Sequence, residues 1–279
     1  MEKLIICAAV TGGEHGREAN PHIPYTPDEI AGAVNDAVEA GAALCHVHVR
    51  HPDGRPAQDV DLLRRVYDRV AAHGDVILNL TTAPGGDVRG DERLRCLDLR
   101  PEMASFDAGS MNFGDDVFEN SPAFLRRMAQ RMLDAGAKPE LEIFDSGMIG
   151  NCLRLQREGL LLAPLHFQFV LGVPGGAPAT ARTLLHLVES IPPGSTWSAT
   201  GIGRAWVEIA MVTMALGGHV RVGLEDAVYY SRGELARSSA QMVARVVRLA
   251  AELGRPLATP AEARQILGLA PRSPAADGC

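Results

Sequence analysis

The sequence predicts a single α/β domain, a (β/α)8 TIM barrel with eight parallel strands inside a ring of helices. Short runs rich in β-branched residues alternate with amphipathic stretches of helical period, which is typical of a parallel sheet. Eight such units fit within 279 residues, and this length favours closure into a barrel over an open doubly wound sheet. With 46% hydrophobic and 22% charged residues, the chain can bury a core of this size.

Each predicted strand is followed by a helical segment. The strands are expected at residues 4–9, 44–49, 76–81, 103–107, 140–144, 166–171, 196–200 and 219–224. The catalytic domain is expected to cover residues 1–270. Residues 271–279, which contain two prolines and several small residues, are expected to form a C-terminal tail.

Several helix boundaries are marked by capping residues. Thr26 is followed by Pro27 and, three residues on, by Glu29, which is the pattern of a capping box, and Gly41 is placed to close this helix. Residues 259–262 repeat the pattern, with Gly268 as the stop, and Ser121-Pro122 begins another helix. These signals concern structure alone.

The composition excludes some classes of partner. Lys and Arg number 27 and Asp and Glu 34, which gives a net charge of −7 and argues against binding to nucleic acid or an anionic membrane. The five cysteines are odd in number and form no C-x-x-C pair, so a reducing compartment is expected. The N-terminus fits a first strand better than a signal peptide, and no apolar run has membrane-spanning length; we expect a cytoplasmic protein.

A pair of histidines in the second strand indicates a metal site. His46 and His48 are two residues apart, so both side chains are expected on the inner face, near the C-terminal end where barrel active sites lie. Two convergent imidazoles suit Zn²⁺, or another divalent metal, with a third protein ligand and one open position.

The last strand can supply that third ligand. Alternation places Arg221, Gly223 and Glu225 on one face, and if this face is inward, Glu225 completes a His₂Glu site. The alternative is that Glu225 and Asp226 only begin a helix, where acidic residues are favoured. A buried Arg221 would need a partner of opposite charge.

Several segments resemble the β-keto acid cleavage enzymes, over about residues 3–269. They are HVHVR (46–50), PELEIFDSGMI (139–149) and VRVGLEDAVYY (220–230), and also MASFDAGSMNF (103–113) and ELGRPLATPAEARQILGL (252–269). The resemblance implies a (β/α)8 barrel with one divalent metal, usually zinc, and a homo-oligomer, usually a tetramer. It implies that a short β-keto acid and acetyl-CoA are converted into acetoacetate and a new acyl-CoA.

The resemblance also implies roles for individual residues. The metal ligands are His46, His48 and Glu225; the catalytic residues are Asp226 as general base, Arg221 as its partner, and Glu142; two of the substrate-binding residues are Glu14 and Thr82. The family often has LEDN and SNAQ where this chain has Leu224-Glu225-Asp226-Ala227 and Ser238-Ser239-Ala240-Gln241. These differences spare the ligands but could alter the loop that lines the substrate.

The remaining candidates are inferred from barrel position. Asp107 and Ser110, after the fourth strand, are expected to face the distal end of the substrate. The glycine-rich segment after the seventh strand could form a tight turn or present N–H groups to the CoA pyrophosphate, and the second case makes Gly201, Gly203 and Arg204 CoA-binding residues. Arg50 is expected to point outward with a structural role.

Two other functions fit parts of the pattern. One is a different metal-dependent barrel enzyme, such as an amidohydrolase or a metal aldolase. Amidohydrolases also use an H-x-H pair, but on the first strand and with further histidines on later strands. The other is a non-catalytic sensor of a CoA ester or a small acid, which would not need a Lewis acid.

Overall fold

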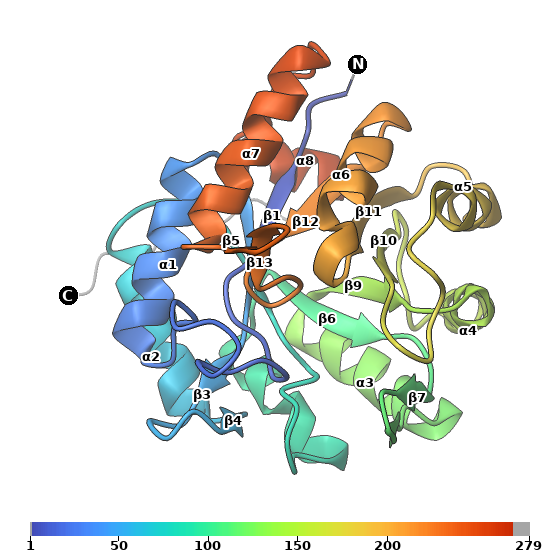
Figure 1. Ribbon diagram of the computed structural model, residues 1–279. Helices are drawn as coiled ribbons and strands as arrows, with labels where there is room; N and C mark the ends of the chain where they lie inside the picture. Colours follow the sequence, from blue (N-terminus) through green and yellow to red (C-terminus); the bar gives the residue numbers. More distant parts are fainter. Residues whose placement is uncertain (1, 270–279) are drawn as a thin grey trace.

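The computed structural model describes residues 2–269 and confirms the predicted barrel (Figure 1). Eight parallel strands close in the order β1-β2-β5-β6-β9-β10-β11-β12. They are β1 Ile6–Ala9, β2 Leu44–Val47, β5 Ile77–Leu80, β6 Met103–Asp107, β9 Lys138–Ile143, β10 His166–Leu171, β11 Thr196–Gly201 and β12 His219–Val222. The expected tail, residues 271–279, lies outside the described residues.

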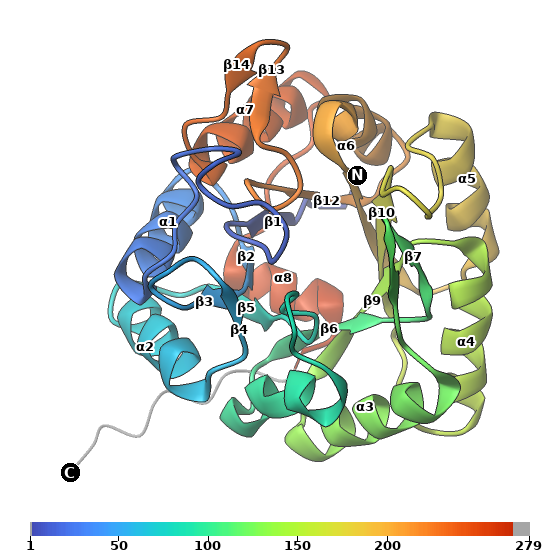
Figure 2. The same ribbon diagram turned by 60° about the horizontal axis from the view of Figure 1, so that its bottom comes forward.

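Helical segments connect the strands and surround them (Figure 2). They are α1 Pro27–Glu39, α2 Val60–Ala71, the 3₁₀ segment η1 Gly90–Leu99, α3 Pro122–Ala135, α4 Ser146–Arg157, α5 Ala181–Ser190, the 3₁₀ turn η2 Gly203–Ala205, α6 Trp206–Ala215, α7 Ser239–Glu252 and α8 Pro260–Leu267. No helix within residues 2–269 is both long and apolar enough to cross a membrane.

The helix ends follow the capping pattern of the sequence. Thr26 and Glu29 form a complete capping box at α1, and Thr259 and Glu262 form another at α8. Gly268, in the left-handed conformation, ends α8. The first of these helices ends at Glu39 rather than directly at Gly41, which follows with a φ of +118°.

Three short hairpins extend the loops that follow barrel strands. They are β3 Val49–Arg50 with β4 Pro56–Ala57, β7 Met111–Phe113 with β8 Asp116–Phe118, and β13 Tyr229–Ser231 with β14 Glu234–Leu235. Each lies C-terminal to a barrel strand, on the side where this fold carries its active sites.

The opposite end of the barrel is closed by α8. Ala263 and Leu267 of this helix pack against Ile5, Leu44 and Met103, and together they form part of a buried apolar cluster separate from the main core. Arg264 of the same helix bonds the carboxylates of two residues outside it, Asp75 at 2.8 Å and Glu102. This end therefore supports the fold, and the polar interior lies toward the other.

Candidate metal centre and catalytic site

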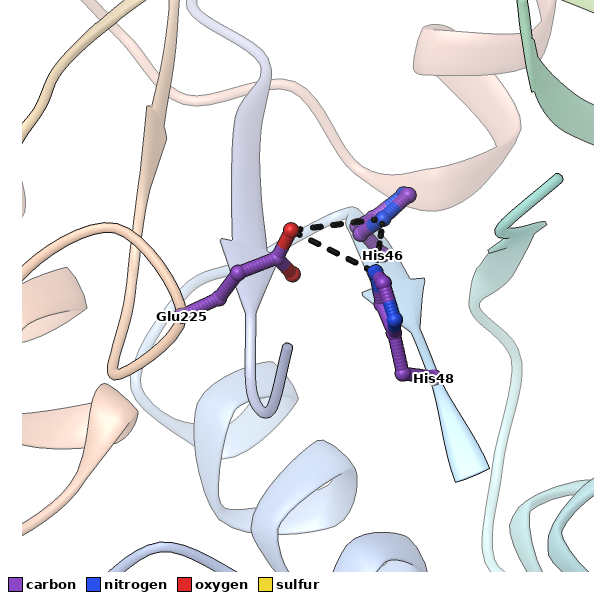
Figure 3. Close-up of side chains that lie close together, drawn as sticks. All are labelled: His46, His48 and Glu225. Atoms are coloured by element: carbon purple, nitrogen blue, oxygen red, sulfur yellow. Dashed lines mark hydrogen bonds and ion pairs between the residues drawn. The ribbon is translucent and has the colours of Figure 1, made fainter. Parts of the chain in front are cut away.

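Three predicted ligands converge above the apolar floor of the barrel. His46 belongs to β2, His48 follows the last residue of that strand, and Glu225 follows β12. The two Nε2 atoms are 3.1 Å apart, and Glu225 Oε1 lies 3.6 Å from His46 Nε2 and 3.4 Å from His48 Nε2 (Figure 3). Two atoms bound tetrahedrally to zinc lie about 3.3 Å apart, since the Zn–N distance is about 2.0–2.1 Å. The spacing of the three atoms therefore fits one divalent ion.

The chemistry of the three side chains also fits a cation. His46 and His48 are buried, and Glu225 keeps 16% of its side chain exposed, so the site is reachable from solvent. Glu225 Oε2 is buried without a hydrogen-bond partner within residues 2–269. Burial lowers the pKa of His46 well below its usual value, which favours the neutral ring that a metal ligand needs.

Arg221 of β12 is the centre of an acidic cluster beside these ligands. Its guanidinium donates to both oxygens of Asp226, each at 3.0 Å, to Glu142 Oε1 at 2.7 Å and to Glu225 Oε1 at 2.6 Å. Thr200 Oγ1, at the end of β11, donates to Asp226 Oδ2 at 3.1 Å. The structure thus brings the metal ligands and the predicted catalytic residues into one network.

A turn after β12 makes this arrangement possible. The strand ends at Val222, and the N–H groups of Asp226 and Ala227 both bond to Gly223 O. In a continuing strand, consecutive side chains would point to opposite faces. The turn instead lets both Glu225 and Asp226 reach the same guanidinium.

One guanidinium cannot neutralise three carboxylates, and their pKa values separate accordingly. Burial raises the pKa of Glu142 well above its usual value, and it also raises the pKa of Asp226. Burial would raise the pKa of Glu225 as well, but Arg221 and the two imidazoles outweigh it and lower that pKa. Glu225 therefore stays anionic, as the predicted metal ligand must be, while Asp226 is better suited to accept a proton near neutral pH.

A second buried acid lies one pleat below Glu142. Glu140 is fully buried, and its carboxylate accepts a hydrogen bond from the amide of Asn79 at 2.5 Å. Burial raises the pKa of Glu140 to about 7. Alternation along the fifth strand indicates that residues 140 and 142 share a face, yet only Glu142 was predicted to belong to the site.

The two residues predicted to face the distal end of the substrate differ in burial. Asp107 ends β6, pairs in register with Glu142, and lies 3.4 Å from an Arg93 guanidinium nitrogen. Ser110 is exposed, and its Oγ accepts a hydrogen bond from Asn120 N at 2.8 Å. Arg93 was not predicted to contribute, although it is buried against Asp107 and two phenylalanine rings.

Thr82 and Glu14 differ in exposure. Thr82 is fully buried, and its hydroxyl donates to Ser105 O at 2.8 Å, so this hydroxyl is engaged with the backbone of β6. Glu14 lies in the loop after β1 with an exposed side chain. With its proton engaged in this way, the Thr82 hydroxyl can meet a substrate as an acceptor, and the Glu14 carboxylate is reachable from solvent.

The glycine-rich segment after β11 is a tight turn in this structure. A Cβ on Gly201 would lie 2.7 Å from Ala205 O, and Gly203 has a φ of +62°. The N–H of Gly203 donates to Asp226 O at 2.8 Å, so it is not free for a phosphate. Arg204 is exposed and is the charged group that this segment offers to an anion.

The expected outward direction of Arg50 is wrong, although its contacts fit the structural role. Its side chain is buried, with only 3% of the residue exposed, and it bonds three backbone carbonyls instead of pointing outward. Alternation from His46 through His48 to Arg50 was the signal that could have indicated this, because it places all three on one face.

Comparison with known proteins shows the family of this chain. The family model described as beta-keto acid cleavage enzyme matches residues 3–269. The chain belongs to the β-keto acid cleavage enzyme family. This confirms the resemblance inferred from the sequence.

Characterised members of the β-keto acid cleavage enzyme family align with nearly the full chain. The 3-keto-5-aminohexanoate cleavage enzyme of Fusobacterium nucleatum subsp. nucleatum is 46% identical over 271 residues, covering 96% of this chain and 99% of the relative. The 3-oxoadipate:acetyl-CoA acetyltransferase of Cupriavidus necator is 38% identical, covering 96% and 95%. The 3-dehydrocarnitine:acetyl-CoA trimethylamine transferase of Rhizobium meliloti is 37% identical, covering 97% and 98%.

A solved structure supports the fold of this family member. The apo structure of ObcA superposes with a TM-score of 0.79 at 24% identity and covers 89% of this chain and 66% of that chain. At this identity the likeness concerns the barrel alone.

Proposed function

We propose that this chain condenses a short β-keto acid with acetyl-CoA and releases acetoacetate and a new acyl-CoA. The observation that carries the proposal is the His46, His48 and Glu225 cluster joined through Arg221 to Asp226, in a chain of the β-keto acid cleavage enzyme family. The alternatives, an amidohydrolase, a metal aldolase or a sensor, have no comparable support.

The cluster is proposed to hold Zn²⁺ or another divalent metal through two imidazole Nε2 atoms and a carboxylate oxygen. A metal bound there would supply Lewis acidity toward the keto and carboxylate oxygens of the substrate. Glu225 is held for this role by Arg221, which bonds one of its oxygens at 2.6 Å. An N/N/O ligand set accepts several divalent metals, and zinc is our first choice.

Asp226 is proposed as the general base. Arg221 donates to both of its oxygens, and Thr200 also donates to Oδ2, so the carboxylate has a fixed direction. It would remove a proton from the carbon between the keto and carboxylate groups, and this carbon would then bond to the acetyl carbon with loss of the CoA thiolate. The thiolate would attack the original keto carbon, and the bond to the former α-carbon would break with its electron pair left on that carbon, releasing acyl-CoA. Asp226 would return its proton to this carbon, which gives acetoacetate and regenerates the carboxylate. Glu142, bonded to the same guanidinium, would keep Arg221 in place.

Charge at the distal end suggests the class of β-substituent. Asp107 and Glu142 lie side by side on neighbouring strands. Each is already paired with a buried arginine, Asp107 with Arg93 and Glu142 with Arg221. A second carboxylate on the substrate would therefore meet acids without an available cation. We propose a neutral or cationic substituent, such as the amino group of the substrate named for the F. nucleatum relative.

Acetyl-CoA is proposed to bind at the rim beside η2, where Arg204 could contact its phosphates. Thr82, Glu14 and Ser110 are proposed to line the keto-acid side. We propose a cytoplasmic location, which the free thiols of the described cysteines support. We also propose a homotetramer, which the resemblance to the family implies. Light scattering coupled to gel filtration measures the oligomeric state.

The test is a turnover assay with purified protein, zinc, acetyl-CoA and a panel of β-keto acids, with acetoacetate as the readout. We expect 5-amino-3-oxohexanoate to give a kcat/KM at least about tenfold higher than 3-oxoadipate, since one unpaired buried charge costs well over 1.4 kcal/mol. Asp226→Asn should retain zinc and lose turnover. Absence of acetoacetate with every keto acid would contradict the proposed function. Full activity of Asp226→Asn would contradict the assignment of Asp226 as the base.

A further inference from the structure

The loop after β1 packs against Glu225, one of the three proposed metal ligands. A Cβ on Gly12 would lie only 2.4 Å from Glu225 Cγ, and a Cβ on Gly13 would lie 2.3 Å from Pro84 O. The loop backbone therefore fills the space between a metal ligand and the segment after β5. Any shift of this backbone would change the room left for the Glu225 side chain.

Arg50 holds this loop from the side of β3. Its Nη2 donates to His15 O at 2.6 Å and, by a shorter bond, to Gly12 O, and its Nη1 donates to Gly54 O at 2.7 Å. The guanidinium carbon lies 5.1 Å from the centre of the Tyr25 ring, which belongs to the same loop. The two carbonyls bonded by Nη2 lie on either side of Glu14 in the sequence.

The partners of Arg50 distinguish it from an ordinary structural ion pair. Within residues 2–269 no carboxylate lies within 4.0 Å of its guanidinium, and its buried Nε has no hydrogen-bond partner. The guanidinium therefore bonds main-chain carbonyls instead of a carboxylate. Its planar shape lets it bond several of them at fixed angles. A lysine ammonium keeps the charge but cannot reproduce this geometry.

We propose that Arg50 is a positioning residue, which locks residues 12–15 against Glu225 and so fixes both the metal-ligating carboxylate and Glu14. The parts of this inference that concern catalysis and metal affinity rest on the proposed function; the part that concerns the loop does not. The competing explanation is that Arg50 only stabilises the β3–β4 hairpin through Gly54.

The first experiment compares Arg50→Lys with Arg55→Lys in the full-length protein. Arg55 lies in the same hairpin, but its side chain is 76% exposed and pairs with Asp53. We expect Arg50→Lys to lower zinc affinity about 10–100-fold in a chelator competition, the range typical of residues that orient metal ligands. We also expect the amides of residues 12–16 to exchange hydrogen about tenfold faster or more, and Arg55→Lys to change neither quantity.

The outcomes separate the two explanations. If Arg50→Lys lowers only the melting temperature, with zinc affinity and loop exchange as in the wild type, Arg50 is a hairpin stabiliser and the proposal is wrong. Should Arg50→Lys fail to fold, Gly12→Ala tests the same contact from the other side, because its Cβ would press on Glu225. Zinc affinity unchanged in Gly12→Ala would then overturn the coupling between loop and ligand.

A double-mutant cycle tests the link to Glu14. In the turnover assay, Arg50→Lys should lower kcat/KM about tenfold or more in the wild-type background but less than about twofold in a Glu14→Gln background. Equal losses in both backgrounds would show that Arg50 does not act through Glu14. If the wild type shows no turnover or binds no zinc, the proposed function fails, while the exchange measurement still decides whether Arg50 holds the loop.

Discussion

Removal of the Arg221 guanidinium should destabilise the protein strongly and in a pH-dependent way. Arg221→Met replaces a buried side chain by an apolar one and removes four hydrogen bonds, to Glu142, Glu225 and Asp226, at 2.6–3.0 Å. Loss of one partner from a buried ion cluster costs about 3–5 kcal/mol, because the remaining charges stay desolvated. We expect this loss in the free energy of unfolding at pH 7, out of a total of about 5–15 kcal/mol.

The sign of the pH dependence follows from the three acids. Arg221 lowers the pKa of all three in the folded wild type, so their folded-state pKa values are higher in the variant. A raised folded-state pKa gives stability that is lost as pH rises, so the deficit of the variant should shrink from pH 7 to pH 5.

Urea unfolding of metal-free protein measures both quantities. The control is Arg126→Met, because Arg126 pairs with Glu158 at 2.8 and 2.9 Å on the surface, where water screens the pair and its contribution to stability is small. A deficit of Arg221→Met no larger than that of the control, or one independent of pH, would refute the reasoning.

Three further predictions concern single side chains. Glu225→Gln should lower zinc affinity about 10–100-fold in a chelator competition, since an amide replaces an anionic ligand; unchanged affinity would exclude Glu225 as a ligand. Glu140→Gln should remove a pH-dependent part of the free energy of unfolding, because burial raises the pKa of the wild-type carboxyl to about 7. Its contribution is fully present below pH ~4.5 and is lost as pH rises through about 7, roughly 3 kcal/mol in total. Urea unfolding of metal-free protein across this range checks it, and parallel curves for the two proteins would contradict it. Gly223→Ala should lower the free energy of unfolding by about 3 kcal/mol or more, since its Cβ would lie 2.0 Å from Ala9 O. The control Gly32→Ala, with open space around it in α1, should be neutral or stabilising. Similar melting temperatures for the two variants would contradict the predicted clash.

The fold and the metal ligands could be predicted because local patterns determine them. The alternation of strands and helices gave the barrel, with two strands matching to the residue, β6 and β10. The i, i+2 spacing of His46 and His48 brought the two rings to one face, even though β2 ends at Val47. The His₂Glu geometry is confirmed, whereas the binding of a metal there stays a prediction.

The rest of the site depends on turns and on contacts between distant segments. Strand alternation cannot place both Glu225 and Asp226 on Arg221, because that requires the turn at Gly223. Thr200 lies 26 residues from Asp226 in sequence, and no local pattern marks it as the partner of that carboxylate. The inward direction of Arg50 follows from the same alternation as that of His46 and His48, but its partners are backbone carbonyls, which leave no trace in side-chain types.

Because α8 packs across the end of the barrel beneath the histidines, we expect the reactants and products to pass through the other end. If the proposed reaction is correct, two reactants enter and two products leave past the same rim, and the largest of them carries a nucleotide. The small keto acid must then go in ahead of the thioester, and acetoacetate, formed underneath, must wait until the new thioester has departed. Steady-state kinetics should therefore be ordered, with acetoacetate acting as a competitive inhibitor toward the keto acid.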